Sequence, residues 1–404
     1  MTEKIVILET LKMYKVVLLL VLSMTFVSAY YGLTEGDPCQ DPKGNDGICV
    51  NIKDCRSAMD IVKKQIVTTV CGFNKTDPIV CCLKNDTSFP AVNLREKETT
   101  CEPYTPRRPD MEFGKKAFHK CIEYQEEMKY PCLPNNTRRD ACSDPPPDPN
   151  HRQGIPAGRG QFPHMALLGY TKNPSNLDTA EWLCGGSIIS ERYILTAGHC
   201  TVHSRLGPVA IARLGILKRT DPKNVMRDYN IKRYIKHPEY KPPSKYNDIA
   251  LLETDKDIVF RNKHIVPACL DVGDDSWESE AATASATGWG ELDEWVNADV
   301  LQIMEISKFS DAECAEQFGP HRLLRAGFDT NTQICYGHRQ IPRDTCTGDS
   351  GGPLQVDFGS VECMQKVIGV TSFGKACGKT GQPGVYTRVR PYVPWIEAMV
   401  WPSA

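Results

Sequence analysis

Short apolar runs separated by Gly, Pro and Asn dominate the chain from residue 153 onward. Ser187-Ile188-Ile189 and Tyr193-Ile194-Leu195-Thr196 are two examples. Runs of this length between turn-forming residues are typical of β-strands rather than of helices. The pattern therefore predicts an all-β domain over residues 153–404.

A helical period is visible only near the C-terminal end of the chain. Within Val393–Val400, the residues Trp395, Ile396 and Met399 recur at a spacing that places them on one face of a helix. The pattern predicts a helix over this stretch. The sequence contains no internal repeat that would indicate a solenoid or a propeller.

The N-terminal segment has the pattern of a secretory signal peptide. Lys12 and Lys15 precede the apolar run Val16–Phe26, and small residues ending at Ala29 follow it. The alternative is a membrane anchor, but the run is shorter than the roughly 20 apolar residues that a spanning helix needs. We expect residues 1–29 to be a signal peptide, the protein to be secreted, and no membrane partner.

Composition narrows the classes of protein. A chain of 404 residues is long enough for two folded units. Its formal net charge of −2 argues against a nucleic-acid partner, which requires a basic surface. The 18 cysteines suit an oxidising compartment, where disulfides persist. Paired Cys-x-x-Cys motifs are absent, so we expect no metal site and no cofactor.

Two further zones precede the β domain. Residues 36–83 form a small cysteine-dense module, and residues 84–152 form a polar, proline-rich connector. The connector includes Asp144–Pro149, whose prolines favour extended, exposed backbone, so it is predicted to be a linker. Glycosylation sequons begin at Asn74, Asn85 and Asn135.

Three extended motifs supply the groups that serine-based peptide hydrolysis needs. Thr196-Ala197-Gly198-His199-Cys200 offers a base. Asn247-Asp248-Ile249-Ala250-Leu251-Leu252 offers a carboxylate to orient that base, and Gly348-Asp349-Ser350-Gly351-Gly352-Pro353 offers a hydroxyl nucleophile. A lone His, Asp or Gly-Asp-Ser-Gly would more often be structural. All three motifs in this order indicate a catalytic triad.

From about Pro156 to Ala404 these motifs resemble the chymotrypsin and trypsin family. The resemblance implies two packed antiparallel β-barrels with the triad in the cleft between them. It implies that His199 is the general base, Asp248 its orienting partner and Ser350 the nucleophile. The backbone N–H groups of Gly348 and Ser350 would form the oxyanion hole.

Substrate specificity is also implied by the resemblance. Asp344, six residues before Ser350, stands where trypsin-like members place a carboxylate at the bottom of the primary pocket. Gly374 and Gly384 match the two pocket-wall glycines, which leave room for a long side chain. The alternative is a surface aspartate near a disulfide. We expect cleavage after Arg or Lys, with Phe373 as an apolar wall of the pocket.

The N-terminal module resembles the clip domain of arthropod serine proteases. Six cysteines alone allow 15 disulfide connectivities. A module this small needs disulfide cross-links to fold. We expect it to dock or regulate other proteins, with a passive spacer as the alternative. The pairings implied by the two resemblances are Cys39–Cys81, Cys49–Cys71, Cys55–Cys82, Cys184–Cys200, Cys314–Cys335 and Cys346–Cys377.

A further cysteine is expected to tether the connector to the β domain. Relatives use a cysteine near Cys269 for this purpose, so the pair Cys142–Cys269 is predicted, which would keep the clip module attached after activation. The partners of the four remaining cysteines are left open; these are Cys101, Cys121, Cys132 and Cys363.

The activation motif departs from the family pattern. Relatives are cut before an Ile-Val-Gly-Gly type sequence, and the new amino group then pairs with the aspartate before the nucleophile, here Asp349. The expected position holds His151-Arg152-Gln153-Gly154. A terminus at Gln153 would bury its amide without assured partners. Three explanations fit: an error in the gene sequence at this junction, an unusual activating cut, or a domain that stays zymogen-like.

The resemblance therefore implies a secreted trypsin-like zymogen, similar to the snake and Persephone-like subgroup of clip-domain proteases. Such proteases act in extracellular cascades of arthropod innate immunity, in Toll activation or melanisation. Expected partners are downstream zymogens as substrates, an upstream activating protease and serpin-type inhibitors. The alternative is a catalytically silent homologue that acts as a binding cofactor.

Overall fold

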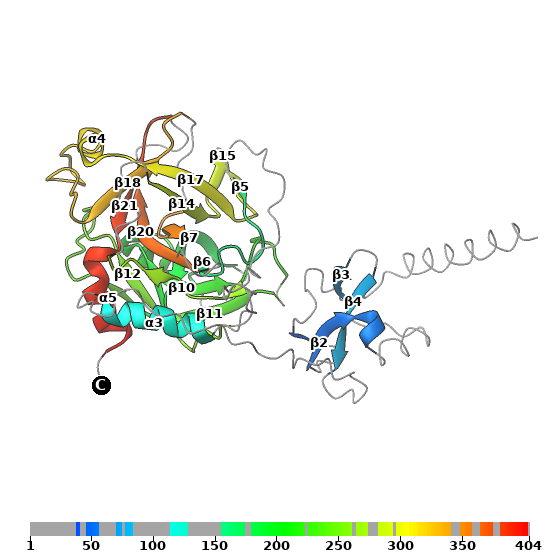
Figure 1. Ribbon diagram of the computed structural model, residues 1–404. Helices are drawn as coiled ribbons and strands as arrows, with labels where there is room; N and C mark the ends of the chain where they lie inside the picture. Colours follow the sequence, from blue (N-terminus) through cyan, green and yellow to red (C-terminus); the bar gives the residue numbers. More distant parts are fainter. Residues whose placement is uncertain are drawn as a thin grey trace, which may run out of the picture. The chain divides into compact units, whose positions relative to one another are not determined.

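The short apolar runs of the sequence form β-strands in the computed structural model of the protein (Figure 1). The structure describes residues 38–40, 46–55, 70–74, 77–83, 114–127, 155–173, 179–222, 225–260, 264–273, 282–293, 296–340, 348–357, 364–374 and 380–402. The chain divides into two units, Met1–Glu98 and Thr99–Ala404. The predicted signal peptide lies outside the described residues, and within them no helix is long and apolar enough to span a bilayer.

The first unit is a small sheet held by disulfides. Its strands are β1 (Pro38–Gln40), β2 (Asp46–Asn51), β3 (Val70–Asn74) and β4 (Asp77–Leu83), in the order β1-β2-β4-β3. The disulfides are Cys39–Cys81, Cys49–Cys71 and Cys55–Cys82, the pairs that the clip resemblance implied. All six cysteines are buried, with Ile79 and Val80 between them. Cross-links therefore make up most of the described core, as expected for a unit too small to bury much apolar surface.

Six strands of the second unit close into a first barrel. They are β6 (Met165–Tyr170), β7 (Glu181–Ile188), β8 (Tyr193–Thr196), β10 (Gly207–Leu214), β11 (Arg227–Lys236) and β12 (Ala250–Thr254), with the short β9 (Val202–His203) beside β10. Their order is β11-β12-β8-β7-β6-β10, and β10 pairs with β11 to complete the ring. Every residue of β6, β8 and β12 is buried, which explains why these strands are mostly apolar in sequence.

A second set of six strands closes in the same way. They are β14 (Thr283–Gly288), β17 (Gln302–Lys308), β18 (Gln333–Gly337), β19 (Pro353–Asp357), β20 (Gln365–Phe373) and β21 (Gly384–Arg388). Pairing of β20 with β21 completes this ring. The short strands β5 (Ile155–Pro156) and β13 (Cys269–Leu270) add to β17 and β20, and β15 (Glu291–Asp293) pairs with β16 (Val296–Asn297). The prediction of an all-β domain with two barrels is confirmed.

The C-terminal helix has the bounds that the sequence predicted. It is α5 (Val393–Val400), and its buried residues are Val393, Ile396 and Val400. Met399 was expected on the buried face but is 38% exposed, because the face that packs inward is rotated by about one residue. The apolar period was therefore correct, and its phase was partly wrong.

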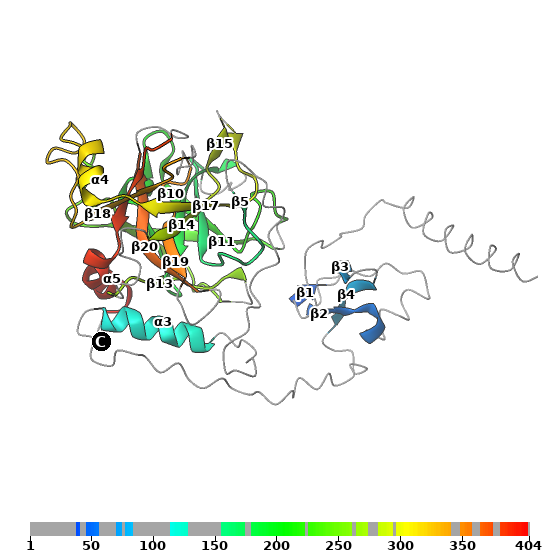
Figure 2. The ribbon, with the colours of Figure 1, turned by 45° about the horizontal axis from the view of Figure 1, so that its top comes forward.

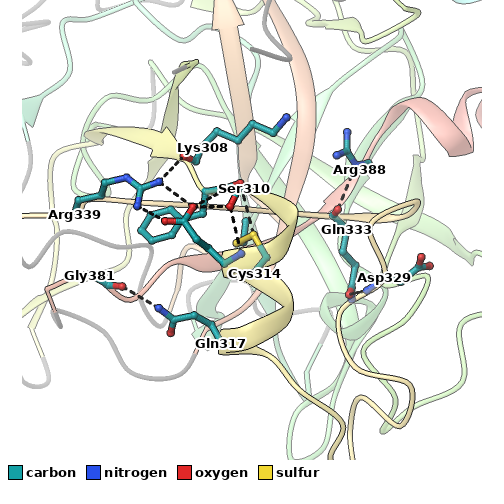
Figure 3. The surroundings of a disulfide bond; sticks show 12 residues. Lys308, Ser310, Cys314, Gln317, Asp329, Gln333, Arg339, Gly381 and Arg388 are labelled. Atoms are coloured by element: carbon teal, nitrogen blue, oxygen red, sulfur yellow. Dashed lines mark hydrogen bonds and ion pairs between the residues drawn. A yellow bond between two sulfur atoms is a disulfide. The ribbon is translucent and has the colours of Figure 1, made fainter. Parts of the chain in front are cut away.

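The sequence pattern missed a short helix that follows β17. This is α4 (Asp311–Gln317), which begins with a capping box in which Ser310 and Glu313 satisfy each other's backbone donors. The disulfide Cys314–Cys335, expected from the resemblance, joins α4 to β18 (Figure 3). Arg339 forms a bidentate ion pair with Glu313 on the outer side of this helix. A helix of two turns offers too short an apolar period to detect in sequence.

A second unpredicted helix lies within the expected linker. It is α3 (Lys115–Glu127), and Ala117, Cys121 and Tyr124 face inward at helical spacing. Figures 1 and 2 show α3 alongside α5. The expectation of extended, exposed backbone is therefore wrong for this stretch. The many Lys and Glu residues of α3 concealed a narrow apolar stripe, which packs on Val266, Cys269 and Met364.

A disulfide fixes α3 to the β domain, and it is Cys121 rather than Cys142 that provides it. The structure contains Cys121–Cys269, so the predicted pair Cys142–Cys269 is wrong. Cys121 lies on the buried stripe of α3, directly over the short strand that carries Cys269. Sequence alone offered no reason to choose Cys121 while α3 was taken for extended chain.

Polar contacts complete the docking of α3. The hydroxyl of Tyr124 donates to a carboxylate oxygen of Glu191 over 2.7 Å and accepts from the indole N–H of Trp401 over 3.2 Å. The backbone N–H of Ala117 donates to Glu397 of α5 over 2.7 Å. Burial raises the pKa of Tyr124, so its hydroxyl keeps the proton that it donates.

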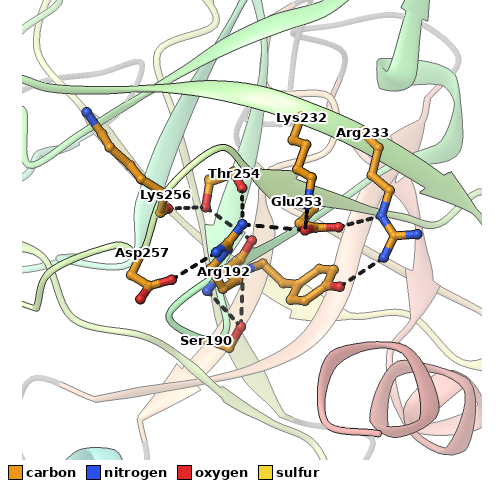
Figure 4. A network of polar contacts seen from close by, with 9 residues as sticks. Ser190, Arg192, Lys232, Arg233, Glu253, Thr254, Lys256 and Asp257 are labelled. Atoms are coloured by element: carbon orange, nitrogen blue, oxygen red, sulfur yellow. Dashed lines mark hydrogen bonds and ion pairs between the residues drawn. The ribbon is translucent and has the colours of Figure 1, made fainter.

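A buried carboxylate fixes the outer end of strand β12. Glu253 is 7% exposed and accepts from Arg192, Lys232 and Arg233 (Figure 4). A bulge in β11 between Ile231 and Arg233 turns both cations of that strand toward Glu253. The network therefore fixes β12 against β11 and the loop before β8.

A second polar network crosses from one barrel to the other. His164, at the start of β6, donates from Nε2 to Oε1 of Gln355 in β19 over 2.7 Å. Gln355 in turn donates to the hydroxyl of Thr287 in β14 over 3.1 Å. All three side chains are buried, so each must find its partner inside the protein. Burial lowers the pKa of His164 to about 4, although the bond to Gln355 opposes that shift.

We expect the stability of the protein to fall between pH 6.5 and pH 4 because of His164. The unfolded imidazole takes up a proton near pH 6.5, whereas the folded one stays neutral down to about pH 4. The unfolded state then binds the extra proton, so acid favours unfolding by up to about 3 kcal/mol over this window. Denaturant melts at several pH values measure the slope. A His164→Asn variant should lose that part of the slope, and an unchanged slope would exclude this assignment.

Loss of the Tyr124 hydroxyl should weaken the docking of α3. Tyr124→Phe keeps the ring contact with Phe260 but leaves the Glu191 carboxylate without its donor. We expect the free energy of unfolding to fall by about 1–2 kcal/mol, measured by denaturant titration. Tyr234→Phe, at a side chain that is 41% exposed, is the matched control and should change stability by less than about 0.5 kcal/mol. Equal effects of the two substitutions would contradict the role assigned to Tyr124.

Candidate active site

Antiparallel pairing of β8 and β12 brings His199 close to Asp248. Thr196, the last residue of β8, stands opposite Ala250, the first residue of β12. His199 follows that end of β8 on a short helical turn, Gly198–Thr201, and Asp248 precedes β12 by two residues. His199 and Asp248 are 49 positions apart in sequence, but they lie next to neighbouring strand ends at the same edge of the sheet.

Two hydrogen bonds join His199 and Asp248. The imidazole Nδ1–H donates to Oδ2 of Asp248 over 2.8 Å, and the backbone N–H of His199 donates to Oδ1 over 2.9 Å. A proton on Nδ1 leaves Nε2 with a free lone pair, which is the state a general base requires. The His199 side chain is 26% exposed and Asp248 is fully buried, so only the histidine of this pair can meet a substrate.

The Asp248 carboxylate is held in its charged form. Burial alone would raise the pKa of this carboxyl. The positive charge that His199 carries when it is protonated, together with hydrogen bonds from His199 and the Ser372 hydroxyl, outweighs burial and sets the pKa of Asp248 below its usual value. Asp248 therefore stays ionised at neutral pH and can stabilise an imidazolium beside it.

The backbone around Asp248 is fixed by three other side chains. Asn247 adopts a left-handed conformation with φ of 54°, which places the following carboxylate toward His199. The hydroxyl of Tyr392 donates to Oδ1 of Asn247 over 2.7 Å, and that of Thr387 donates to the carbonyl of Asp248 over 3.0 Å. These bonds compensate the unusual backbone geometry of Asn247.

The turn that carries Ser350 packs directly on the first barrel. The backbone N–H of Gly185 in β7 donates to the Ser350 carbonyl over 2.8 Å. Gly351 has φ of 76°, and a Cβ there would lie 2.2 Å from the Thr196 hydroxyl and 3.1 Å from the nitrogen of Ala197. Glycine at this position thus brings Ser350 against the end of β8, three residues before His199.

A disulfide reinforces the same contact. Cys184–Cys200, a pair implied by the resemblance, joins the residue before Gly185 to the residue after His199. The strand that binds the Ser350 carbonyl and the turn that presents the imidazole are therefore cross-linked. The structure thus brings the surroundings of all three predicted triad residues together at one edge of the two barrels.

Asp349 is buried beneath the Ser350 turn. It is 4% exposed, and its Oδ1 accepts from the backbone N–H of Gly290 over 2.9 Å. A Cβ at Gly288 would lie 2.0 Å from this oxygen, and one at Gly290 would lie 2.6 Å from it. The carboxylate therefore depends on two glycines for its space. Gly348, with φ of 98°, adopts a conformation that glycine alone enters at little cost.

The two predicted pocket-wall glycines lie on paired strands. Gly374 follows the end of β20, and Gly384 begins β21, where Phe373 stands opposite Val385. Phe373 packs edge-to-face on Phe318, with ring centroids 5.7 Å apart. Asp344, the pair Cys346–Cys377 and the activation segment 151–154 lie outside the described residues. The prediction for the base of the pocket therefore stays a prediction.

Two groups of residues in the described chain have the spacing of metal ligands. They are Cys39, Cys49 and Cys71 in the first unit, and Cys184, His199 and Cys200 in the second. Every one of these cysteines is in a disulfide, so none offers a thiolate. The donor sets therefore do not suit a metal ion.

Comparison with known protein families gives two matches. Residues 151–396 match the family model described as Trypsin, and residues 39–82 match the regulatory CLIP domain of proteinases. The chain belongs to the trypsin family of serine proteases. The trypsin domain thus covers the two barrels and the His199–Asp248 pair, and the clip domain covers the disulfide-linked sheet.

Individual relatives support the same combination of clip and trypsin domains. Serine protease snk from Drosophila melanogaster is 30% identical over 92% of this chain and 80% of its own length. Phenoloxidase-activating factor 1 from Holotrichia diomphalia is 29% identical over 93% and 97%. CLIP domain-containing serine protease C9 from Anopheles gambiae is 34% identical over 70% and 79%. The resemblance to arthropod clip-domain proteases is confirmed.

Sequence reasoning missed several residues that support the trypsin-domain site. Ser372 donates to Asp248, although only its neighbours Phe373 and Gly374 were given roles from the sequence, and Tyr392 supports Asn247 from the far end of the chain. A lone hydroxyl in a strand gives no sequence signal for such a role. The glycines of Gly288-Trp289-Gly290 offered a weak signal, since two glycines around a buried tryptophan indicate close approach of another group.

A methyl group at Gly288 should disturb the Ser350 turn. Gly288→Ala forces the Asp349 carboxylate to move, because the new Cβ would lie 2.0 Å from Oδ1. We expect a loss of about 1–3 kcal/mol in the free energy of unfolding and slower reaction of Ser350 with an active-site probe. Gly319→Ala is the matched control, since a Cβ there meets nothing within 4 Å. A Gly288 variant that matches this control would show that the space around Asp349 is not limiting.

Proposed function

We propose that the protein is a secreted serine endopeptidase zymogen that cleaves proteins after Arg or Lys. The observation that carries this proposal is the His199–Asp248 pair beside the Ser350 turn. The carboxylate is buried, ionised and bonded to Nδ1, while the turn with the hydroxyl packs on the strand end that leads to His199. A structural or regulatory role alone gives no reason for this arrangement.

The chemistry follows from the positions of these groups. Nε2 of His199 takes the proton of the Ser350 hydroxyl as its oxygen attacks the carbonyl carbon of the substrate. The carbonyl oxygen becomes negatively charged and accepts hydrogen bonds from the backbone N–H groups of Gly348 and Ser350. His199 then passes the proton to the leaving amine, and water releases the acyl group by the same steps. Asp248 stabilises the imidazolium throughout.

Specificity for a long cation is proposed from Asp344 and the glycines of the pocket wall. Gly374 and Gly384 lie on the paired ends of β20 and β21, where side chains would narrow the pocket. Asp344 would pair with the guanidinium or ammonium group of the substrate. Phe373 would supply the apolar wall along the aliphatic stem of that side chain.

The setting that we propose is an extracellular protease cascade of arthropod innate immunity, in Toll activation or melanisation. Support comes from the clip domain and from relatives of the same domain organisation, among them one named a phenoloxidase-activating factor. In such a cascade the substrates are downstream zymogens, an upstream protease makes the activating cut, and serpin-type inhibitors end the activity. The predicted signal peptide supports a location outside the cell.

The second candidate is a catalytically silent homologue that acts as a binding cofactor. The observation that favours it is His151-Arg152-Gln153-Gly154, which replaces the aliphatic pair that relatives insert beside the aspartate before the nucleophile. Asp349 is buried and accepts a hydrogen bond from the backbone N–H of Gly290. Its charge must be compensated both before and after any activating cut. The intact Ser350 favours the enzyme over the silent homologue.

Labelling with an Arg-directed covalent probe distinguishes these candidates. The full-length secreted protein is treated with the probe before and after limited proteolysis, alongside Ser350→Ala. We expect the probe to attach to Ser350 only after proteolysis, and not at all in the variant. Protein that is folded, as shown by a cooperative melt, and is never labelled after any cut would overturn the enzyme and support the silent homologue.

Replacement of the pocket carboxylate should remove the preference for basic residues. In Asp344→Ser we expect kcat/KM for substrates with Arg before the cut bond to fall by about 30-fold or more, since a buried cation would lose its partner. Substrates with Leu or Phe at that position should lose far less. Peptide cleavage measured across such a series gives the comparison, and equal losses for basic and apolar substrates would exclude Asp344 as the specificity residue.

A further inference from the structure

Lys245 is a cation at the edge of the site to which no role has been given. It precedes Asp248 by three residues, and its side chain is half-buried. Its backbone N–H donates to the carbonyl of Leu323 over 3.0 Å, and its carbonyl accepts from the Gln333 side chain over 3.2 Å. The backbone of Lys245 is therefore held by hydrogen bonds on both sides of the residue, so its side chain extends from a fixed position.

The ammonium group of Lys245 lies over an aromatic ring that borders the site. Its Nζ is 5.7 Å from the centroid of Phe373, within the range of a cation–π contact. Phe373 stands between Ser372, which donates to Asp248, and Gly374 of the predicted pocket wall. Phe318 holds the Phe373 ring from another side. The contact with Phe373 thus holds the ammonium group of Lys245 beside the predicted pocket wall.

The charge of Lys245 is not neutralised by a neighbouring carboxylate in the described part of the chain. Several other cations of the trypsin domain are paired there, for example Arg213 with Asp228 and Arg339 with Glu313. Lys245 has no such ion pair, and its charge contributes to keeping Asp248 ionised. The ammonium group therefore lies at the edge of the site without a described carboxylate that would compete with an acidic substrate side chain for an ion pair.

The proposed specificity for Arg or Lys suggests how a substrate would lie. The residue before the cut bond would enter between Gly374 and Gly384, next to Phe373. On this proposed placement, the residues that precede it in the substrate would lie along the Phe373 ring and the ammonium group above it.

We propose that Lys245 makes the site select substrates with Asp or Glu two to four residues before the cut bond. The proposal rests on the proposed function and names the substrate class of the same site. An acidic side chain at one of these positions would form an ion pair with Lys245 at the rim. Such exposed pairs are worth up to about fivefold in binding, and salt screens them.

The test uses the full-length protein after the proteolysis that makes Ser350 reactive. Fluorogenic peptides that end in Arg before the leaving group carry Glu, Gln or Lys at the second, third or fourth residue before the cut. We expect kcat/KM to be about three- to fivefold higher for Glu than for Gln at one or more positions. The ratio should shrink in 0.5 M NaCl, where the Debye length is only a few Å.

Three variants and one control isolate Lys245. Lys245→Gln should bring the Glu-to-Gln ratio close to one, Lys245→Glu should invert it in favour of Lys peptides, and Lys245→Arg should retain it. The exposed Lys241 lies four residues earlier, and Lys241→Gln should keep the wild-type ratio. This control separates a local contact from a change in overall charge.

The outcomes separate the two proposals. Cleavage of Arg peptides with the same ratio in wild type and Lys245→Gln overturns the acidic preference and leaves the protease intact. An equal loss of ratio in Lys241→Gln also overturns it, since the effect would then be general charge. No cleavage of any peptide overturns the proposed function and the substrate class with it.

Discussion

Burial of one charged carboxylate governs the arrangement of this trypsin domain. Asp248 is fully buried, and a buried charge is tolerated only where its oxygens find donors. Two donors come from His199 and one from Ser372 in the other barrel, while Thr387 binds its carbonyl. The two barrels therefore meet around this residue, and the same contacts orient the imidazole.

The local motifs of the site could be predicted from sequence because each is itself a folding signal. Gly351 and Gly198 stand beside their functional residues for reasons of space, since a Cβ would strike Thr196 in one case and the Tyr240 ring in the other. Strand pairing then brings these short segments together. The helix α5 could also be predicted from its apolar period, because that period spans the whole helix.

Features that depend on distant partners could not be read in this way. The stripe of α3 has only three buried apolar residues, and two of them pack on Val266 and Met364, more than a hundred residues away. The choice of Cys121 as the partner of Cys269 follows from that docking and not from cysteine spacing. Ser372 and Tyr392 act through hydroxyl groups that look the same in sequence wherever they point.

The carbonyl of Ser350 is bound by a strand of the opposite barrel, and this has a consequence for how the proposed activity would be lost. His199 and Asp248 belong to the first barrel, and Ser350 lies on the turn that leads into β19 of the second. Any partial opening that separates the barrels breaks the reactive centre before either barrel unfolds. Reactivity of Ser350 would therefore report the cohesion of the whole trypsin domain, and inactivation would precede the main melting transition.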